Sequence, residues 1–317
     1  MDTRVKPDTF TALASRFDLG HWSAQRRQEV ERALEHWVNA DPRAGLDHGA
    51  PAELVRAMRY AVLDGGKRLR PLLVLAACES VQGHTAAALR AACAVELIHA
   101  YSLVHDDMPC MDNDVLRRGK PTVHVQFGEA TALLAGDALQ ALAFELLTPD
   151  DGTVPVATQA ALCRLLARAV GSGGMAGGQA IDLASVGCSL SEKQLRDMHE
   201  LKTGALLQGS VLMGAACGRT DARQLDALSV FGAAIGLAFQ VVDDILDVTT
   251  DSVTLGKTAG KDAVTAKPTY VSVLGLERSA QHAQELLATA LMALERGEFH
   301  QAGALRALAH MVVNRSH

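Results

Sequence analysis

Two clusters of aspartate are the residues of this sequence best suited to chemistry. The first has the sequence DDMPCMD at Asp106–Asp112, the second has DDILD at Asp243–Asp247, and apolar residues precede both. Crowded carboxylates repel one another, and their desolvation is costly unless cations compensate. Carboxylate oxygens that leave room for water and phosphate suit Mg²⁺. Facing each other, the clusters would hold several Mg²⁺ ions and, through them, a diphosphate; solvated acidic helix ends are the alternative.

Helix geometry distinguishes the two clusters. In the second cluster the first and last carboxylates are four residues apart, so they share one helix face with Gln240. Asp106 and Asp112 are six residues apart and would lie about 240° around an intact helix. Pro109 stands between them and disfavours a continuous helix. We therefore expect the chain to break there and to bring Asp112 back towards Asp106.

Basic residues lie close in sequence to the first cluster or follow a pair of glycines. Arg117, Arg118 and Lys120 come directly after the first cluster, and Lys67 and Arg70 follow Gly-Gly. The three-residue spacing of Lys67 and Arg70 predicts one shared helical face. Guanidinium and ammonium groups are natural phosphate ligands. Beside a metal-type acidic cluster, these cations predict phosphate binding more strongly than solvated surface charge.

One histidine is placed to join the acidic site. His99 lies seven residues before Asp106, which puts both on nearly the same helix face, and Glu96 is near that face too. We expect His99 to contact a ligand. His105 and His124 are read as structural side chains.

Three further segments carry polar groups or glycines. Lys202-Thr203 places a cation and a hydroxyl in an otherwise apolar helix, which marks it as a candidate for the site. Gly256–Lys261 only superficially resembles a phosphate-binding loop, because Asp251 stands where that motif needs glycine and no strand precedes it. Gly171–Ala176 is a weak dinucleotide-binding match, better explained by close helix packing or a helix break.

Apolar residues recur at helical spacing through most of the chain, while strand alternation is nearly absent. With 317 residues and only 4% aromatic residues, the sequence predicts an all-α fold: a single domain, residues 1–317, of about ten or more helices. Residues 1–25 could form a flexible amino-terminal segment. The clearest apolar stripes lie at 129–147, 156–170, 191–217, 222–248 and 279–296, and breaks are predicted at 64–66, 109–121, 148–155, 171–178 and 251–268.

Charge and cysteine content exclude several classes of protein. A net charge of −6 gives no support for a nucleic-acid partner. The six cysteines form no C-x-x-C pair, which fits free thiols in a reducing cytoplasm. Met1–Asp18 lacks the apolar core of a signal peptide. No window reaches 18 uncharged apolar residues, so a membrane span is not expected.

Taken together, five ordered motifs resemble those of the short-chain trans-isoprenyl diphosphate synthase family. The likeness is densest from about Tyr60 to Leu276, and it is closest to bacterial farnesyl diphosphate synthases. The motifs are GGKRLRP at 65–71, ELIHAYSLVHDDMP at 96–109, DNDVLRRGKPT at 112–122, FQVVDDILD at 239–247 and KPTYVS at 267–272. One departure is Val115, where many relatives carry an acidic residue.

The resemblance implies an all-α isoprenoid synthase fold around a central active-site cavity, a homodimer, and condensation of isopentenyl diphosphate with an allylic diphosphate. It implies about three Mg²⁺ ions per site, with Mn²⁺ as a substitute. Asp106, Asp112 and Asp243 would be the metal ligands, supported by Asp107, Asp244 and Asp247. Isopentenyl diphosphate contacts would be Lys67, Arg70, His99 and Arg118. Allylic diphosphate contacts would be Arg117, Lys202, Thr203, Gln240, Lys257 and Lys267.

The resemblance also implies a mechanism and a product. Mg²⁺ and cationic side chains would stabilise the departing diphosphate, while Gln240 and the carbonyls near Lys202-Thr203 would face the allylic cation as dipoles. Tyr101, five residues before Asp106, would limit the product to fifteen carbons as farnesyl diphosphate, and Ser102 aligns more nearly with Asp106. Geranylgeranyl or geranyl diphosphate synthesis remains an alternative, as does a catalytically silent partner subunit.

Overall fold

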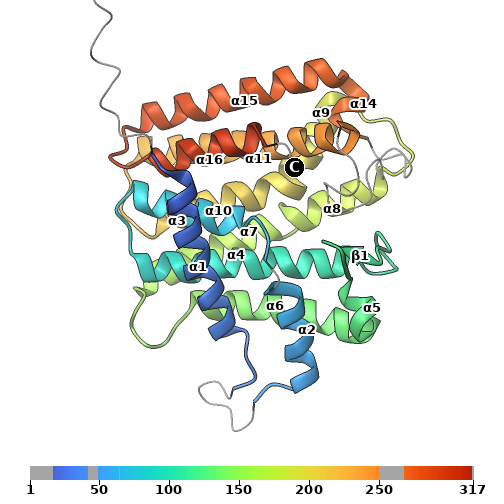
Figure 1. The fold of residues 1–317 in the computed structure, drawn as a ribbon. Helices are drawn as coiled ribbons and strands as arrows, with labels where there is room; N and C mark the ends of the chain where they lie inside the picture. Colours follow the sequence, from blue (N-terminus) through green and yellow to red (C-terminus); the bar gives the residue numbers. More distant parts are fainter. Residues whose placement is uncertain (1–16, 42–48, 64, 250–267, 316–317) are drawn as a thin grey trace, which may run out of the picture.

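Helices form almost all of the regular structure in the computed structural model, which describes residues 17–41, 49–63, 65–249 and 268–315 (Figure 1). The first half of the chain forms α1 (Leu19–Trp37), α2 (Ala52–Val62), α3 (Leu69–Ser80), α4 (Thr85–Asp106), α5 (Val123–Phe127), α6 (Glu129–Leu147) and α7 (Val156–Val170). The second half forms α8 (Met175–Ala184), α9 (Glu192–His199), a π-helix (Glu200–Gly204), α10 (Ala205–Ala216), α11 (Ala222–Thr249), α14 (Tyr270–Leu274), α15 (Leu276–Gly297) and α16 (Gly303–Val313). The all-α prediction is confirmed.

Local sequence signals explain where several helices begin. Asp18 accepts a hydrogen bond from the His21 amide at 2.9 Å and so caps α1. Residues 19–25, which the sequence left as a flexible segment, are therefore helical, while residues 1–16 lie outside the described part of the chain. Ser191 and Gln194 form a capping box at the start of α9. The apolar stripes at 129–147 and 156–170 coincide with α6 and α7.

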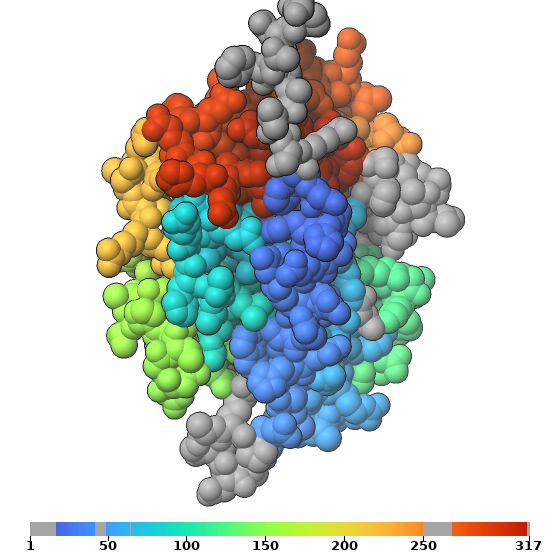
Figure 2. Space-filling model, turned by 60° about the vertical axis from the view of Figure 1, so that its left-hand side comes forward, coloured from blue at the N-terminus to red at the C-terminus, as the bar shows by residue number. Residues whose placement is uncertain are grey.

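Two clusters of buried apolar side chains form the interior of the bundle. Helices α4, α6 and α7 contribute to the first cluster, and α11, α15 and α16 contribute to the second. Helices α3 and α10 contribute to both, so the two clusters share these two central helices. Helix α1 packs across α3 and α4 and reaches α16, as the space-filling view shows (Figure 2). Each buried leucine or valine side chain stabilises the fold by about 1.5–3 kcal/mol.

Three helices, α4, α6 and α11, are long and apolar enough to cross a membrane when judged by length and composition. Helices α4 and α11 are mostly buried inside the bundle, packed against α6 and α15 respectively, and each carries one of the aspartate clusters. Burial within the protein thus accounts for their apolar character. The absence of a membrane span stays a prediction.

The predicted break at 171–178 is wrong in its second half. Helix α8 begins at Met175, so Gly177 and Gly178 are helical residues. A β-carbon at Gly178 would lie 2.1 Å from the Lys202 amide nitrogen, so glycine allows α8 to approach the π-helix at backbone distance. The stripe at 191–217 is also not one regular helix, because the π-helix separates α9 from α10.

The two helices that carry the aspartate clusters end on the same side of the molecule. In Figure 1, α4 and α11 both run towards the right, where the β1–β2 hairpin and α14 lie. Strands β1 (Leu116–Arg117) and β2 (Lys120–Pro121) form this short antiparallel hairpin just after the first cluster. The bundle therefore brings both acidic helix ends and the basic hairpin to one end of the protein.

Candidate active site

The first aspartate cluster lies where the chain leaves α4 and turns back. The Asp112 amide donates to the Asp106 carbonyl at 2.8 Å, which brings Asp112 back beside Asp106, as the proline had predicted. Burial raises the pKa of Asp106 to about 6; Lys202 opposes this rise, and the Asp112 carboxylate adds to it. The same influences show that Lys202, from the π-helix, faces the first cluster. A cation at this point would relieve the repulsion between the two carboxylates.

The six aspartates of the two clusters fall into two groups by exposure. Asp107, Asp244 and Asp247 are buried. The other three, Asp106, Asp112 and Asp243, are partly exposed to solvent. The side chain of Asp243 is 36% exposed. The second group is the set that can reach a ligand without rearrangement, and it is the set for which direct metal binding was predicted.

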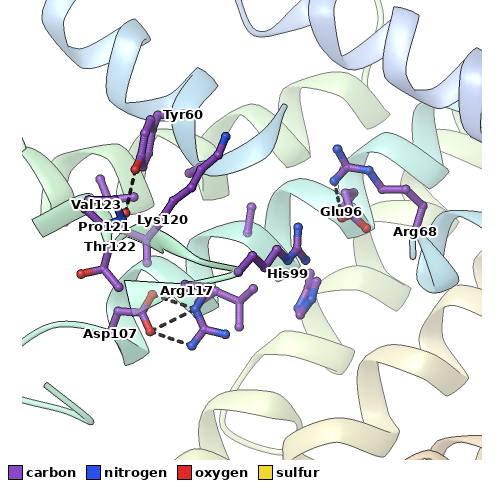
Figure 3. A pocket seen from close by; sticks show the side chains of 15 residues that line it. Tyr60, Arg68, Glu96, His99, Asp107, Arg117, Lys120, Pro121, Thr122 and Val123 are labelled. Atoms are coloured by element: carbon purple, nitrogen blue, oxygen red, sulfur yellow. Dashed lines mark hydrogen bonds and ion pairs between the residues drawn. The ribbon is translucent and has the colours of Figure 1, made fainter. Parts of the chain in front are cut away.

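Asp107 holds Arg117. Its carboxylate accepts hydrogen bonds from Arg117 Nε at 2.8 Å and Nη2 at 2.6 Å, and only 2% of Asp107 is exposed (Figure 3). The bonds fix the guanidinium on the β1 strand next to the first cluster. Paired, two-point bonds of this kind also fix the direction in which the guanidinium faces. The structure therefore shows Asp107 paired with Arg117 at the lining of a pocket.

Asp244 anchors a chain of polar groups that begins at Thr203. The Thr203 hydroxyl donates to Gln240 Oε1 at 3.0 Å, and Gln240 Nε2 donates to Asp244 Oδ1 at 2.8 Å. The amide of Tyr270 donates to Asp244 Oδ2 at 2.7 Å. The chain fixes the orientation of the Gln240 amide, so the predicted contact residues Thr203 and Gln240 lie together.

Lys202 is held by a carboxylate that the sequence did not single out. Its Nζ lies 2.5 Å from Asp182 Oδ2, and Asp182 is buried on α8. The π-helix brings Lys202 to this position, and single-turn π-helices of this kind are frequent at functional sites.

The π-helix also packs closely against α11. A β-carbon added at Gly236 of α11 would lie 2.8 Å from the Cα of Gly204. Lys257 and Lys267 lie outside the described residues.

Two further predicted cations, Arg70 and Arg118, lie near His99. Burial lowers the pKa of His99 well below its usual value, and the nearby guanidiniums of Arg70, Arg118 and Arg117 lower it further. His99 is thus a neutral imidazole among cations. Burial lowers the pKa of Arg70 to about 10, and its buried Nε has no hydrogen-bond partner among the described residues. Such a group is suited to an anion.

The two glycines before Lys67 shape this part of the site. Gly66 has a φ of 128°, and a β-carbon there would lie 2.8 Å from the Arg118 guanidinium. Arg118 Nη1 donates to the Gly65 carbonyl at 2.6 Å. Lys67 precedes α3, which begins at Leu69, so it does not share a helix with Arg70 as the spacing predicted. Both side chains nevertheless lie within electrostatic range of Asp243.

A buried ion-pair network fixes the backbone between Lys67 and Arg70. Arg68 adopts a left-handed conformation with φ of 50° before α3. Its guanidinium bonds Glu31 of α1 at 2.7 Å, Glu96 of α4 at 2.6 Å and the carbonyl of Val62 at 2.7 Å. Glu96, which the sequence placed near the ligand face, is thus paired with Arg68.

A pocket opens beside α4, between α2 and the hairpin (Figure 3). It includes His99, Arg117 and Arg118, whereas Asp106 and Asp243 lie outside its lining. Its rim is closed on one side by a hydrogen bond of 2.8 Å from the Tyr60 hydroxyl to the Pro121 carbonyl. One part of the wall is apolar: Ala61, Ala100, Leu103, Val104 and Val123. The lining also holds two carboxylates, Glu96 and Asp107, each paired with an arginine. A cationic mouth with an apolar wall suits a small diphosphate ester with a hydrocarbon tail.

The carboxylates present fit Mg²⁺ held jointly with a substrate. Within the described ranges, no group of three or more His, Cys, Asp or Glu residues is placed to hold a metal by itself. Mg²⁺ usually takes one or two carboxylates together with water and phosphate oxygens. The Asp106–Asp112 pair on one rim and Asp243 on α11 offer such incomplete sets.

Several residues that build the site carry no signal in the sequence. Asp182 and Lys202 meet across α8 and the π-helix, and Glu31 reaches Arg68 from α1. Arg315, after α16, lies 3.3 Å from Asp243. Each pair joins residues far apart in the chain, so no spacing rule connects them. Sequence spacings of three or four residues in a helix, and of two in a strand, identify only side chains that are neighbours on the same element.

An all-helical bundle of the isoprenoid synthase type, with two aspartate clusters and a set of cations beside them, defines a prenyltransferase. The model of the polyprenyl synthetase family matches residues 51–306, and the chain belongs to this family. It is a short-chain prenyl diphosphate synthase.

Proteins named for different products have similar sequence identity to this chain. It is 50% identical over 273 residues to the probable farnesyl diphosphate synthase of Sinorhizobium fredii, covering 85% of this chain and 80% of that protein. It is 44% identical over 304 residues to geranylgeranyl pyrophosphate synthase 4 of Arabidopsis thaliana, covering 95% and 79%. The apo crystal structure of an FPP/GFPP synthase from Zymomonas mobilis matches with a TM-score of 0.79 and 41% identity, covering 93% and 98%.

Proposed function

We propose that the protein condenses isopentenyl diphosphate with dimethylallyl and then geranyl diphosphate, with Mg²⁺, to give farnesyl diphosphate. The observation that carries the proposal is the separation of two cationic groups. Lys202 faces the first aspartate cluster, Arg70 and Arg118 lie near His99, and Arg117 lies between them, close to both. One group suits a metal-bound diphosphate and the other a diphosphate without metal.

The side chains present account for an ionisation and condensation. Bound Mg²⁺ would neutralise charge on the departing diphosphate. Arg117 and Lys202 would bind that diphosphate as the allylic carbon–oxygen bond breaks. Thr203 and Gln240, joined at 3.0 Å, would present fixed dipoles to the allylic cation. Arg70, Arg118 and neutral His99 would orient isopentenyl diphosphate, whose double bond attacks the cation before a proton passes to the released diphosphate.

Tyr101 supports a product of fifteen carbons. Its half-buried ring meets the ring of His105 edge-on, with centroids 5.7 Å apart. His105 Nε2 lies 3.1 Å from the Leu133 carbonyl of α6, which backs the pair of rings against the neighbouring helix. An aromatic ring on α4, one to two turns before Asp106, would block further growth of the hydrocarbon chain and so form the floor of the product cavity. Geranylgeranyl and geranyl diphosphate are the other candidate products.

Product analysis tests the proposed function. The protein is incubated with labelled isopentenyl diphosphate, each allylic diphosphate in turn, and Mg²⁺; the products are dephosphorylated and separated by chain length. We expect a C15 product, its loss with EDTA, and its return with Mg²⁺. A C20 product from the wild type would refute the farnesyl assignment alone, and no product with any primer would refute the activity.

A single substitution tests the floor. Tyr101→Ala removes the ring from α4 and is expected to shift the products to C20 or longer. Tyr60→Phe serves as the control, because Tyr60 lies on α2 at the pocket rim and its hydroxyl bonds Pro121. We expect this control to leave the product length unchanged. If Tyr101→Ala still gives C15 alone, another residue sets the chain length.

We also propose a homodimer, one domain per chain, and a cytoplasmic location. The two apolar clusters share α3 and α10, which favours one domain. Helix α6 exposes Leu133 and Leu134, and α5 exposes Val125 beside it. An apolar face of this kind suits a second copy of the chain. All six cysteines are free in the structure, which is in keeping with a reducing compartment.

A further inference from the structure

Arg315 lies at the second aspartate cluster although nothing in the sequence pointed to it. It follows α16, near the carboxyl end of the chain and beyond the segment that the family model matches. Its Nη2 donates to the carbonyl of Phe239 at 2.8 Å and to Asp243 Oδ1 at 3.3 Å. Phe239 and Asp243 both belong to α11. The residue that follows α16 by two positions is therefore fastened to the helix that carries the second cluster.

The arginine is held on three sides. Its guanidinium carbon lies 3.9 Å from the centroid of the Phe239 ring, a close stacking contact. The side chain is only 11% exposed, and its buried Nε has no hydrogen-bond partner among the described residues. Arginine remains charged even when burial lowers its pKa, as it does here. A fixed positive charge thus lies against Asp243.

A fixed cation at Asp243 has consequences for a divalent ion. Asp243 is partly desolvated, and an opposite charge compensates that cost while no metal is bound. A metal ion bound to the same carboxylate would bring two positive centres within a few ångströms of each other. Their repulsion is weakly screened in a partly buried site. Either the metal binds less tightly or the arginine leaves.

We propose that Arg315 is the resident counterion of Asp243 and that it lowers the affinity of the second aspartate cluster for divalent metal. The proposal rests on the proposed function only in taking Asp243 as a metal ligand. Arg315 is a positioning residue here: it holds the Asp243 carboxylate in place and opposes a second positive charge at that carboxylate.

Mn²⁺ titration followed by electron paramagnetic resonance tests the proposal without any turnover. Arg315→Gln removes the charge but keeps a polar side chain of similar length. The matched control is Arg306→Gln, which removes the same charge from an exposed position on α16, next to Glu295. Arg315→Lys keeps the charge but loses the planar stacking and the forked hydrogen bonds. Circular dichroism confirms that each variant is folded.

We expect Arg315→Gln to bind Mn²⁺ with a dissociation constant about fivefold lower than the wild type, because one nearby positive charge is lost. Arg306→Gln should match the wild type, and Arg315→Lys should fall between. In an Asp243→Asn background, Arg315→Gln should give no gain. Equal or weaker binding by Arg315→Gln, or the same gain without the Asp243 carboxylate, overturns the proposal. Product analysis of the wild type is independent of these outcomes.

Discussion

At the scale of single residues, the carboxyl group of Asp106, a predicted metal ligand, also carries an energetic cost when it ionises. Burial lifts its pKa from 3.8 to about 6, so the folded protein binds a proton at Asp106 more tightly than the unfolded chain does. Ionisation of this carboxyl therefore disfavours the folded state. The cost is small below pH 4, grows between pH 4 and 6, and approaches about 3 kcal/mol above pH 6.

Asp106→Asn should consequently raise the free energy of unfolding of the metal-free protein at pH 8 while abolishing most turnover. The gain should almost disappear at pH 3, where most of this aspartate is protonated in both states. Urea unfolding at the two pH values, with EDTA present, measures it. Asp243→Asn should also lose turnover, because it removes the predicted ligand on α11. If Asp106→Asn is less stable than the wild type at pH 8, ionisation of Asp106 does not destabilise the folded protein.

Asp107, although adjacent, should behave differently. Because it holds Arg117 through bonds of 2.8 and 2.6 Å, Asp107→Asn should release the guanidinium. We expect KM for the allylic diphosphate to rise about 10- to 100-fold, equivalent to about 1.5–3 kcal/mol for a charge-assisted contact. KM for isopentenyl diphosphate should change far less, and Mn²⁺ binding should persist. Loss of Mn²⁺ binding as severe as in Asp106→Asn would instead make Asp107 a metal ligand.

The sequence predicted the members of the site better than their partners. Pro109 was enough to predict that Asp112 returns to Asp106, because the break is a local property of the backbone. The pairing of Asp107 with Arg117 could not be predicted, since the intervening turn and hairpin decide which carboxylate the guanidinium meets. Asp182 was missed for a stronger reason: only the packing of α8 on the π-helix brings it to Lys202.

At the scale of helices, the contact between α8 and the π-helix positions Lys202. Alanine is the better helix former by about 1 kcal/mol. At Gly178, however, the added methyl group would meet the Lys202 backbone at 2.1 Å from its nitrogen and 2.5 Å from its Cα. Backbone atoms cannot give way as a flexible side chain can. The steric cost should therefore exceed the gain in helix propensity.

Gly178→Ala is expected to lower the free energy of unfolding by about 1–3 kcal/mol and to raise KM for the allylic diphosphate, because α8 must move away from Lys202. Urea unfolding and steady-state kinetics check the two effects. Gly173→Ala is the matched control, since a β-carbon there meets nothing within 4 Å. Equal behaviour of the two variants would mean that the close approach does not position Lys202.

The sequence predicted where helices lie better than it predicted irregular turns and helix starts. Apolar spacing predicted α6, α7 and α11 to within one or two residues, because those helices bury one continuous stripe. The π-helix was not predicted, since one widened turn hardly disturbs the apolar pattern of the segment around it. The start of α3 was misplaced for a tertiary reason: Arg68 takes a left-handed conformation stabilised by Glu31 and Glu96.

At the scale of the whole molecule, the exposed apolar side of α6 is expected to lie between two copies of the chain. Leu134→Asp places a charge at a position that is 57% exposed in the single chain. If a partner covers it, burial of that charge costs several kcal/mol and the dimer should dissociate. Light scattering at several protein concentrations measures the mass. Leu225→Asp, on α11 and 46% exposed, should leave the mass unchanged.

The buried Arg68 guanidinium, held between Glu31 and Glu96, ties α1 to the part of the chain that carries the family motifs. Every motif that marks the family lies within residues 51–306, yet Glu31 lies before that segment. A chain trimmed to those residues would keep all of its recognisable chemistry and lose one of the two carboxylates that hold Arg68. The side chains that hold the Arg68 guanidinium therefore extend beyond the segment that the family model matches.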